Sequence, residues 1–312
     1  MANDKTVVFG ASGLVGSAIV RALKVRRAED ALRPSHRELD LTNQSEVSRW
    51  ISQVKPTRIF LVAGTVGGIK ANSTRPAEFL YNNVMIHANV IHSAYEVGVS
   101  KLLYLGSSCI YPKFATQPIV EEELLSGPLE PTNESYALAK ISGIKMCSSY
   151  RDQYGCNFIS AMPTNLYGPG DNFDPDGGHV IPAMIRKFHT AKLEGSQRVV
   201  VWGSGSPLRE FLHVDDLAEA CLFLMDHYDG REHLNIGSGE EVSIKELANI
   251  VRDVVYPECE VVWDASMPDG TPRKLLDCSR LSQLGWKPTH TLRKSLVQTY
   301  EWFLDNAGRP EA

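Results

Sequence analysis

TVVFGASGLVGSAI spans residues 6–19 and combines three features in one short stretch. Residues 6–10 form an apolar run rich in β-branched side chains, which predicts a buried strand, and the apolar spacing that follows predicts an amphipathic helix over about 14–24. Between them, glycines at positions 10, 13 and 16 allow a tight turn and a close approach of a ligand to the backbone. The helix amino terminus adds free N–H groups and a positive dipole end. The stretch therefore predicts a loop that binds a pyrophosphate, the alternative being a glycine turn without a ligand.

Strand-like apolar runs alternate with helix-length amphipathic segments through the rest of the first half of the chain. Strands are expected at 58–64, 101–108 and 158–162, and helices around 77–97 and 134–154. A further strand expected between residues 24 and 40 is poorly marked. This alternation is typical of an α/β protein with a Rossmann-type, doubly wound parallel sheet that helices cover on both faces.

The pattern changes after Pro163, where a segment rich in Gly, Pro and Asp occupies residues 165–179. The later elements are expected as helices at 181–190, 215–227, 243–254 and 291–305 and strands at 198–202 and 233–236. We expect a dinucleotide-binding domain over 1–165 that also receives part of about 211–237. Residues 166–312 would mainly form a smaller, discontinuous α/β domain for the substrate.

Composition limits the possible partners and the compartment. The 312 residues carry 32 Lys and Arg against 37 Asp and Glu, a net charge of −5, which argues against a nucleic-acid or anionic-membrane surface. No apolar run approaches the roughly 18 residues of a membrane span, and the first residues leave no room for a signal peptide. The six cysteines form no CxxC motif, so no metal site is expected. The chain is expected to be soluble and cytoplasmic.

The segment RPSHRELD, residues 33–40, bears on the choice of dinucleotide. A ribose without a 2′-phosphate calls for Asp or Glu about twenty residues after the glycine loop, whereas a 2′-phosphate calls for Arg. Arg37 and His36 can surround a phosphate, while Glu38 favours the opposite choice. The segment favours NADP(H), the alternative being a solvated charged turn. The residues expected to contact this cofactor here and in the glycine loop are Gly10, Ala11, Ser12, Gly13, Leu14, Val15, Gly16, His36, Arg37, Asp40 and Leu41.

A tyrosine and a lysine suggest carbonyl chemistry. Tyr136 and Lys140 are four residues apart in a helical pattern, so the phenol and the ammonium share one face. Ser107 ends an apolar strand, where ligand chemistry lies in open α/β sheets. A nearby lysine favours the phenolate, which makes the tyrosine a proton donor and acceptor near neutral pH, and the serine can hydrogen-bond to the carbonyl being reduced. The alternative is an exposed Tyr–Lys pair.

With these residues in this order, the chain resembles the extended short-chain dehydrogenase/reductases, which act on nucleotide sugars. The resemblance covers nearly the whole chain and runs through GASGLVGSAI, VGGIKAN, LGSSCIYP, EPTNESYALAK, MPTNLYGP, HVIPAMIRKFH, VWGSG, REFLHVDD and PDGTPRKLLD. More narrowly it is similar to the 3,5-epimerase/4-reductases that convert GDP-4-keto-6-deoxy-D-mannose to GDP-L-fucose. The resemblance implies this activity, NADP(H) as cofactor, a GDP-sugar substrate, and a homodimer built on the helices around 77–97 and 134–154.

Cys109 takes on a specific role within this resemblance. Residues 107–109 stand where sugar 4,6-dehydratases of the superfamily carry Thr-Asp-Glu, and their Glu removes the C5 proton. A 4-keto group acidifies both C3 and C5, so one base and one acid can invert both centres through enolates. By resemblance Cys109 is the base and His179 is the acid, and a nearby cation, such as a protonated His or the oxidised nicotinamide, would favour the thiolate.

The resemblance also implies the remaining contacts. The cofactor groove would include Leu105, Gly106, Lys140, Pro163, Thr164, Asn165, Leu166 and His179, and the substrate would meet Lys187, Trp202, Arg209 and Asp277. Arg209 could instead be a plain surface charge, and Asp277 a helix cap before Ser279. Asp215 and Asp216 are interpreted as amino-terminal capping of a helix.

Two other functions remain open from the sequence. One is another NADP-dependent nucleotide-sugar 4-reductase or 4-epimerase; a redox-neutral 4-epimerase needs no proton transfer at C3 or C5, so Cys109 with His179 argues against it. The more distant one is a protein that senses the dinucleotide without catalysis. Such proteins typically lose the Tyr/Lys pair, which is present here as Tyr136 and Lys140.

Overall fold

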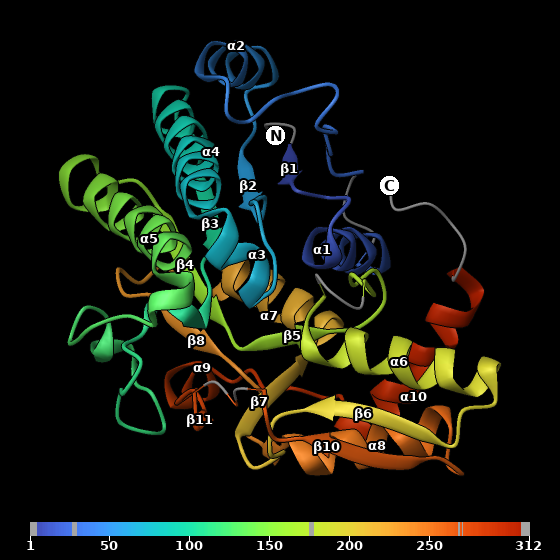
Figure 1. The fold of residues 1–312 in the computed structure, drawn as a ribbon. Coiled ribbons are helices and arrows are strands. Elements are labelled where there is room, and N and C mark those ends of the chain that lie inside the picture. The colour runs from blue at the N-terminus through green and yellow to red at the C-terminus, as the bar shows by residue number, and fades with distance from the viewer. Residues whose placement is uncertain (1–4, 27–29, 175–177, 268, 270, 307–312) are drawn as a thin grey trace.

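The computed structural model describes residues 5–26, 30–174, 178–267, 269 and 271–306 (Figure 1). The first four residues and parts of the 165–179 segment and of the PDGTPRKLLD motif lie outside this range. The strands are β1 (Thr6–Phe9), β2 (Arg58–Leu61), β3 (Lys101–Leu105), β4 (Phe158–Pro163), β5 (Asn165–Tyr167), β6 (Arg198–Trp202), β7 (Leu208–His213), β8 (Leu234–Ile236), β9 (Glu241–Ser243), β10 (Glu260–Asp264) and β11 (Arg273–Lys274). The α-helices are α1 (Leu14–Val25), α2 (Gln44–Val54), α3 (Ile69–Thr74), α4 (Pro76–Glu96), α5 (Glu134–Tyr154), α6 (Val180–Glu194), α7 (Val214–His227), α8 (Ile244–Val255), α9 (Ser279–Gln283) and α10 (Leu292–Asn306).

The largest sheet is parallel throughout, with strand order β1-β2-β3-β4-β8. Its register aligns the carboxyl ends, since Phe9 pairs with Leu61, Leu61 with Tyr104, and Leu105 with Ala161. This confirms the predicted Rossmann-type α/β fold. Parallel strands that end together place the loops that follow them at one edge, where ligands bind in such sheets.

Helices cover both faces of this sheet, so its strands are apolar on both sides (Figure 1). Val8 belongs to the core under α1 and α7, together with Ile19 and Leu217. Its neighbours Val7 and Phe9 belong to the opposite core, under α2, α4 and α5. Alternate side chains of one strand thus anchor both helical layers, which fixes the loop that follows β1.

The strand expected between residues 24 and 40 is reduced to a single bridge, in which Leu32 pairs in parallel with Val7. The bridge at Leu32 lies on one side of β1, and β2 lies on the other side. The strand order therefore reverses at β1. Ligands bind at such a switch point.

The helix α2 was not predicted, although Asn43 accepts hydrogen bonds from the backbone N–H groups of Ser45 and Glu46 as its N-cap.

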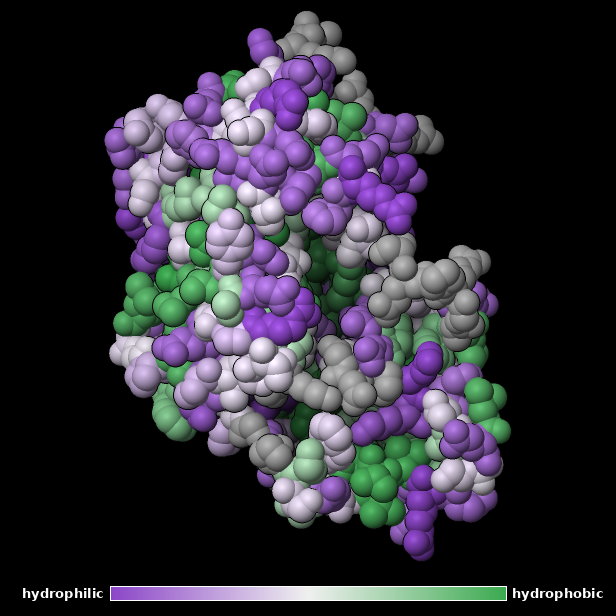
Figure 2. Space-filling view, turned by 45° about the horizontal axis from the view of Figure 1, so that its top comes forward, coloured by the Kyte–Doolittle hydropathy of each residue, from purple (hydrophilic) through white to green (hydrophobic). Residues whose placement is uncertain are grey.

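The later part of the chain forms two smaller sheets, β10-β6 and β11-β7-β5, with β9 paired to β7. Helices α6, α8 and α10 pack with them around a third core that includes Phe188, Val251 and Phe303. The strand β7 overlaps the first five residues of REFLHVDD and was not predicted as a strand. Figure 2 shows a face of the molecule that is hollowed near its middle, with apolar surface inside the hollow and hydrophilic side chains around it. In the described part of the chain, no helix combines the length and the hydropathy needed to span a bilayer.

Candidate active site

The glycine loop turns tightly between β1 and α1. Gly10 has a φ of +90°, and its carbonyl accepts a hydrogen bond from the N–H of Gly13 at 3.1 Å. A Cβ at position 10 would lie 2.7 Å from the backbone of Ala63, and one at Gly16 would lie 2.1 Å from the Gly10 carbonyl oxygen. No side chain caps the start of α1 at Gly13, while Ser12 and Gly13 are exposed. The free N–H groups and the dipole of α1 therefore face an open surface, which suits an anion.

The two opposing charges in the 33–40 segment have different surroundings. Ser35 donates to the Glu38 carboxylate from its backbone N–H and its hydroxyl, both at 2.8 Å, and these hydrogen bonds lower the pKa of Glu38. Asp40 accepts from the N–H and hydroxyl of Thr42 at 2.9 and 2.7 Å, which lowers its pKa. Arg37 and His36 are exposed, and Arg37 has no ion pair with any described residue. Glu38 thus closes its own turn, whereas the guanidinium remains available.

Four predicted catalytic residues meet at the carboxyl end of β3. Ser107 lies at the start of a short 3-10 turn, and its Oγ accepts from the Cys109 N–H at 3.5 Å. Lys140 reaches across from α5 and donates to the carbonyl of Leu105 at 3.0 Å, with its Nζ 5.8 Å from the ring centroid of Tyr136. Tyr136 and Cys109 share one buried cluster. The preceding Gly106 holds the strand end to β4, since its N–H donates to the Ala161 carbonyl at 2.9 Å.

Burial governs the protonation of this cluster. It raises the pKa of Tyr136, as does the neighbouring Cys109, while a hydrogen bond with Ser107 opposes the shift. Burial lowers the pKa of Lys140 to about 8, although Cys109 acts in the opposite direction. The expected phenolate is therefore not favoured: Lys140 bonds to a carbonyl, and burial keeps the phenol protonated. A neutral phenol is a proton donor.

Cys109 is 8% exposed, and burial raises the pKa of its thiol. Lys274, a hydrogen bond with Ser107, and Lys140 act in the opposite direction, in that order of strength. Lys274 and Lys140 are thus cations that favour the thiolate. Sequence reasoning missed Lys274, although the PDGTPRKLLD motif contains it.

His179 is the residue just before α6 and is half-exposed. Its Nδ1 lies 3.9 Å from Oδ1 of Asp171, whose side chain is 3% exposed, and hydrogen bonding with this carboxylate raises the pKa of His179. Asp171 was not predicted. A Cβ at Gly170 would lie 3.4 Å from the Ser17 hydroxyl in α1, so the loop before His179 passes close to the amino end of α1.

Residues 163–166 run from the end of β4 into β5 and join the large sheet to β7. The N–H of Thr164 donates to the Ile236 carbonyl at 2.9 Å, and the Asn165 amide donates to the Glu210 carbonyl at 2.8 Å. Pro163 ends β4, and Leu166 packs against the core under α1 and α7. The segment expected to line the cofactor groove is therefore fixed at the junction of the large and small sheets.

Of the four predicted substrate residues, Lys187 and Trp202 lie together. Arg209 and Asp277 contact other groups. The ammonium of Lys187 stands 4.7 Å above the ring of Trp202, which is half-exposed. Arg209 is half-buried, donates to its neighbouring carbonyl at Leu208, and has a pKa lowered by burial. Asp277 accepts from the N–H of Ser279 at 2.8 Å, but it is not the N-cap of α9, which is Cys278.

The start of α7 also departs from expectation. Asp215 and Asp216 lie in its first turn, but the N-cap is His213, whose ring accepts from the Asp215 N–H. Asp216 instead binds the segment at Thr289 and His290. Within the described ranges His213, Asp215 and His290 are the group whose donor atoms are close enough for a metal ion. Asp215 is already paired with Arg21 at 2.6 Å, and His290 with Asp216 at 2.8 Å. These side chains therefore have structural roles.

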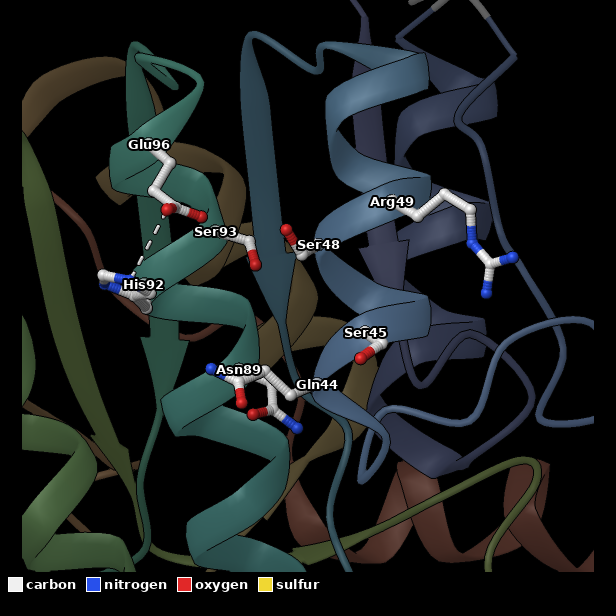
Figure 3. A pocket seen from close by; sticks show the side chains of 8 residues that line it. All are labelled: Gln44, Ser45, Ser48, Arg49, Asn89, His92, Ser93 and Glu96. Carbon is white, nitrogen blue, oxygen red and sulfur yellow. Dashed lines mark ion pairs between the residues drawn. The ribbon is translucent and has the colours of Figure 1, made fainter.

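A polar groove on the outer surface, between α2 and α4, is separate from this site (Figure 3). His92 and Glu96 form an ion pair at 3.7 Å along one wall, and Arg49 points away from the groove. None of the predicted site residues lines it.

Comparison with known proteins agrees with this geometry. The family described as the NAD dependent epimerase/dehydratase family matches residues 6–237. The chain is 60% identical to GDP-L-fucose synthase 1 of Arabidopsis thaliana over 302 residues, 97% of this chain and 94% of the relative. It is 50% identical to GDP-L-fucose synthase of Escherichia coli (strain K12) over 318 residues, 99% of each. A GDP-L-fucose synthetase structure from Naegleria fowleri bound to NADP superposes with a TM-score of 0.93 at 29% identity, covering 100% of this chain and 96% of the other.

Proposed function

The chain belongs to the NAD dependent epimerase/dehydratase family, and from this premise we propose that it converts GDP-4-keto-6-deoxy-D-mannose to GDP-L-fucose. It epimerises C3 and C5 and reduces C4 with NADPH. One observation carries the proposal beyond the family: the Cys109 thiol stands in the same buried cluster as Tyr136, beside Ser107 and Lys140. A simple ketone reductase needs a proton donor at the carbonyl, and a second titratable group there suits proton transfer at the adjacent carbons.

The chain's residues fit NADP(H). The glycines at 10 and 16 occupy positions that a Cβ would fill with backbone clashes, and the uncapped start of α1 suits the pyrophosphate. Arg37 and His36 would hold the 2′-phosphate. Leu105, Gly106, Lys140 and residues 163–166 would line the nicotinamide end, with His179 nearby. When bound, the cofactor supplies the hydride for C4.

Proton transfer at C3 and C5 falls to Cys109 and His179. The Cys109 thiolate removes a proton from the carbon next to the 4-keto group, and the negative charge passes to the C4 oxygen as an enolate. His179 returns a proton to the opposite face of the same carbon, and proton exchange with solvent resets both groups. Asp171 supports this role because it raises the pKa of His179 and so favours the protonated imidazole. The same pair then acts at the second carbon.

Reduction at C4 needs a proton for the oxygen. Tyr136 is the donor, since burial keeps its phenol protonated, and Ser107 hydrogen-bonds to the same carbonyl oxygen. Lys140 keeps a positive charge in the site below its pKa of about 8 and steadies the phenolate that remains after transfer.

The GDP portion is proposed to bind along α6 and β7. Lys187 and Arg209 supply positive charge for the pyrophosphate, Trp202 an exposed ring, and Asp277 a polar contact. In this division residues 1–165, with part of 211–237, bind the cofactor, and 166–312 mainly bind the GDP-sugar. We further propose a cytoplasmic homodimer formed through α4 and α5, which is supported by the exposed apolar side chains of Leu80, Tyr81 and Leu138.

The test is incubation of GDP-4-keto-6-deoxy-D-mannose with NADPH in deuterated water, followed by absorbance at the NADPH band and identification of the product sugar. Oxidation of NADPH together with deuterium at C3 and C5 of GDP-L-fucose is expected. A solved structure described as a GDP-6-OMe-4-keto-L-xylo-heptose reductase from C. jejuni has a TM-score of 0.92 at 36% identity, covering 98% of this chain and 99% of the other. Reduction without deuterium at C3 and C5 would therefore indicate a plain 4-reductase, and turnover only of UDP- or dTDP-sugars would overturn the proposal.

A further inference from the structure

A small pocket opens beside Cys109 and is lined by three segments, one of which is far from the others in the sequence. They are the turn and loop after β3, Glu130 and Asn133 just before α5, and Thr271 with the strand β11. Its lining includes Cys109, Lys113, Thr271, Arg273 and Lys274. Cys109 and Lys274 therefore face one space, which places an ammonium group and a thiol in the same partly desolvated environment.

The position of Lys274 is fixed by its neighbours along the chain. Lys274 pairs in register with Arg209 of β7. The next residue, Leu275, forms two hydrogen bonds with the loop after Cys109. Its N–H donates to the Gln117 side chain, and its carbonyl accepts from the N–H of Ile119, both at 2.8 Å. These bonds tie β11 to the same loop that carries the thiol.

Glu210 adds a buried anchor to this arrangement. Its side chain has no exposed surface, and its carboxylate accepts from the N–H of Leu276 at 3.1 Å and of Gly239 at 2.8 Å. A buried carboxylate that accepts two backbone hydrogen bonds holds both segments firmly. The backbone two residues beyond Lys274 is therefore fixed to β7.

The charges around the two groups favour their mutual interaction. Cys109 is faced by Lys274, Lys140 and the hydroxyl of Ser107, and by the phenols of Tyr104 and Tyr136. Lys274 is faced by Cys109, Arg209 and Glu210, and burial lowers its pKa while Cys109 raises it. Among the described residues, Lys274 has no carboxylate within ion-pair distance. The thiolate of Cys109 is thus a natural counter-charge for its ammonium.

We infer that Lys274 promotes ionisation of Cys109, acting as a positioning residue that holds a positive charge in the pocket both groups line. Removing this charge would leave the thiol protonated over a wider pH range, because burial alone favours the neutral form. The inference rests on the proposed function for its catalytic meaning, since it assigns Lys274 to the proton-transfer half of that reaction. The electrostatic coupling itself can be measured without substrate.

The experiment follows the alkylation of Cys109 by iodoacetamide against pH in the substrate-free protein, with peptide mass spectrometry to separate it from the other five cysteines. Only the thiolate reacts, so the rate reports the thiol pKa. In Lys274→Met the profile should move to higher pH. At any pH below the pKa of the thiol, the rate should fall about tenfold for every pH unit by which the profile moves. Lys274→Arg keeps the charge and should stay close to the native profile.

Arg273→Gln is the matched control, since Arg273 lines the same pocket but is paired with Glu241 at 2.8 Å. Its profile should remain native. If Lys274→Met does not fold, Lys274→Gln replaces it, and circular dichroism and thermal unfolding establish that the variant used is native. A profile identical to native in a folded, uncharged Lys274 variant would overturn the inference. Failure of the proposed function would appear separately, as no deuterium exchange at C3 and C5 in the native protein.

Discussion

Alanine at two positions of the glycine loop adds the same methyl group with different expected results. At Gly16 the new Cβ would lie 2.1 Å from the Gly10 carbonyl oxygen and 2.7 Å from the Cα of Ala11. Ordinary contacts begin at 3.4 Å, so backbone atoms must move by about 1 Å. At Gly13 the nearest heavy atom would be the Gly10 oxygen at 3.6 Å, and the φ of −77° is one that alanine adopts. Only Gly16→Ala disturbs the packing.

The magnitudes follow from these distances. Overpacking costs about 1–3 kcal/mol, and roughly 2–4 °C of Tm accompanies each kcal/mol in a large domain, so Gly16→Ala should lower Tm by about 2–12 °C. In Gly13→Ala the poorer N-cap and the lower entropy of the unfolded chain nearly cancel, and Tm should change by less than about 2 °C. Its methyl group nevertheless stands on the exposed surface that the pyrophosphate is proposed to approach, so the NADPH Kd should rise about tenfold or more.

Differential scanning calorimetry of the cofactor-free protein and fluorescence titration with NADPH separate the two effects. Gly16→Ala should lose both stability and affinity, and Gly13→Ala affinity alone. A native Tm for Gly16→Ala would refute the packing argument. A native NADPH affinity for Gly13→Ala would refute the proposed path of the pyrophosphate across this loop.

Three further results are expected. In Cys109→Ala, solvent deuterium should no longer enter C3 and C5 while NADPH binding is unchanged; product mass spectrometry and fluorescence titration check this, and persistent exchange would remove Cys109 from the role of base. Since burial lowers the pKa of Lys140 from 10.5 to about 8, its charge opposes folding below that pH and the cost disappears as the pH rises from about 8 to 10.5. The Tm advantage of Lys140→Met over the native protein should shrink across this range, and a constant difference would contradict it. Asp216→Ala removes the acceptor for the N–H groups of Thr289 and His290 and should cost about 2–4 kcal/mol, which urea unfolding measures; a cost below about 1 kcal/mol would show that this segment is held elsewhere.

Local patterns were sufficient for the central sheet. Residues 7–9, 59–61 and 102–105 form unbroken apolar runs that are buried, and such runs are typical of strands that helices cover on both sides. The strand near Leu32 could not be predicted with definite bounds, since a single bridge at a sheet edge leaves no periodicity. The helix α2 was missed although its buried Val47 and Ile51 have helical spacing and Asn43 and Glu46 stand three apart in a capping pattern.

The residues of the candidate site also differ in whether they could be predicted from local sequence patterns. Ser107, Tyr136 and Lys140 could be named because each lies in a local element of recognisable type, at a strand end or on one helix face. Lys274 and Asp171 could not be named from the sequence. The strand β11 has two residues and exists only through its pairing with β7, and the contact between Asp171 and His179 depends on the path of a loop without regular structure. Their proximity to the site is a tertiary property.

The difference between local and tertiary properties also explains how a chain with a net charge of −5 can bind a dinucleotide and a nucleotide sugar. Many of its arginines are paired with carboxylates on the surface, as Arg231 is with Asp152 and Arg26 with Glu219. Among the described residues, Arg37, Arg209 and Lys274 have no such partner, and Arg209 and Lys274 are neighbours across two strands. Net charge sums paired and unpaired groups alike, whereas an anion is attracted mainly by the unpaired ones. The small sheet therefore has a chemical role: by pairing β11 with β7, it brings two cations that have no ion-paired carboxylate to the edge where the large sheet presents Cys109.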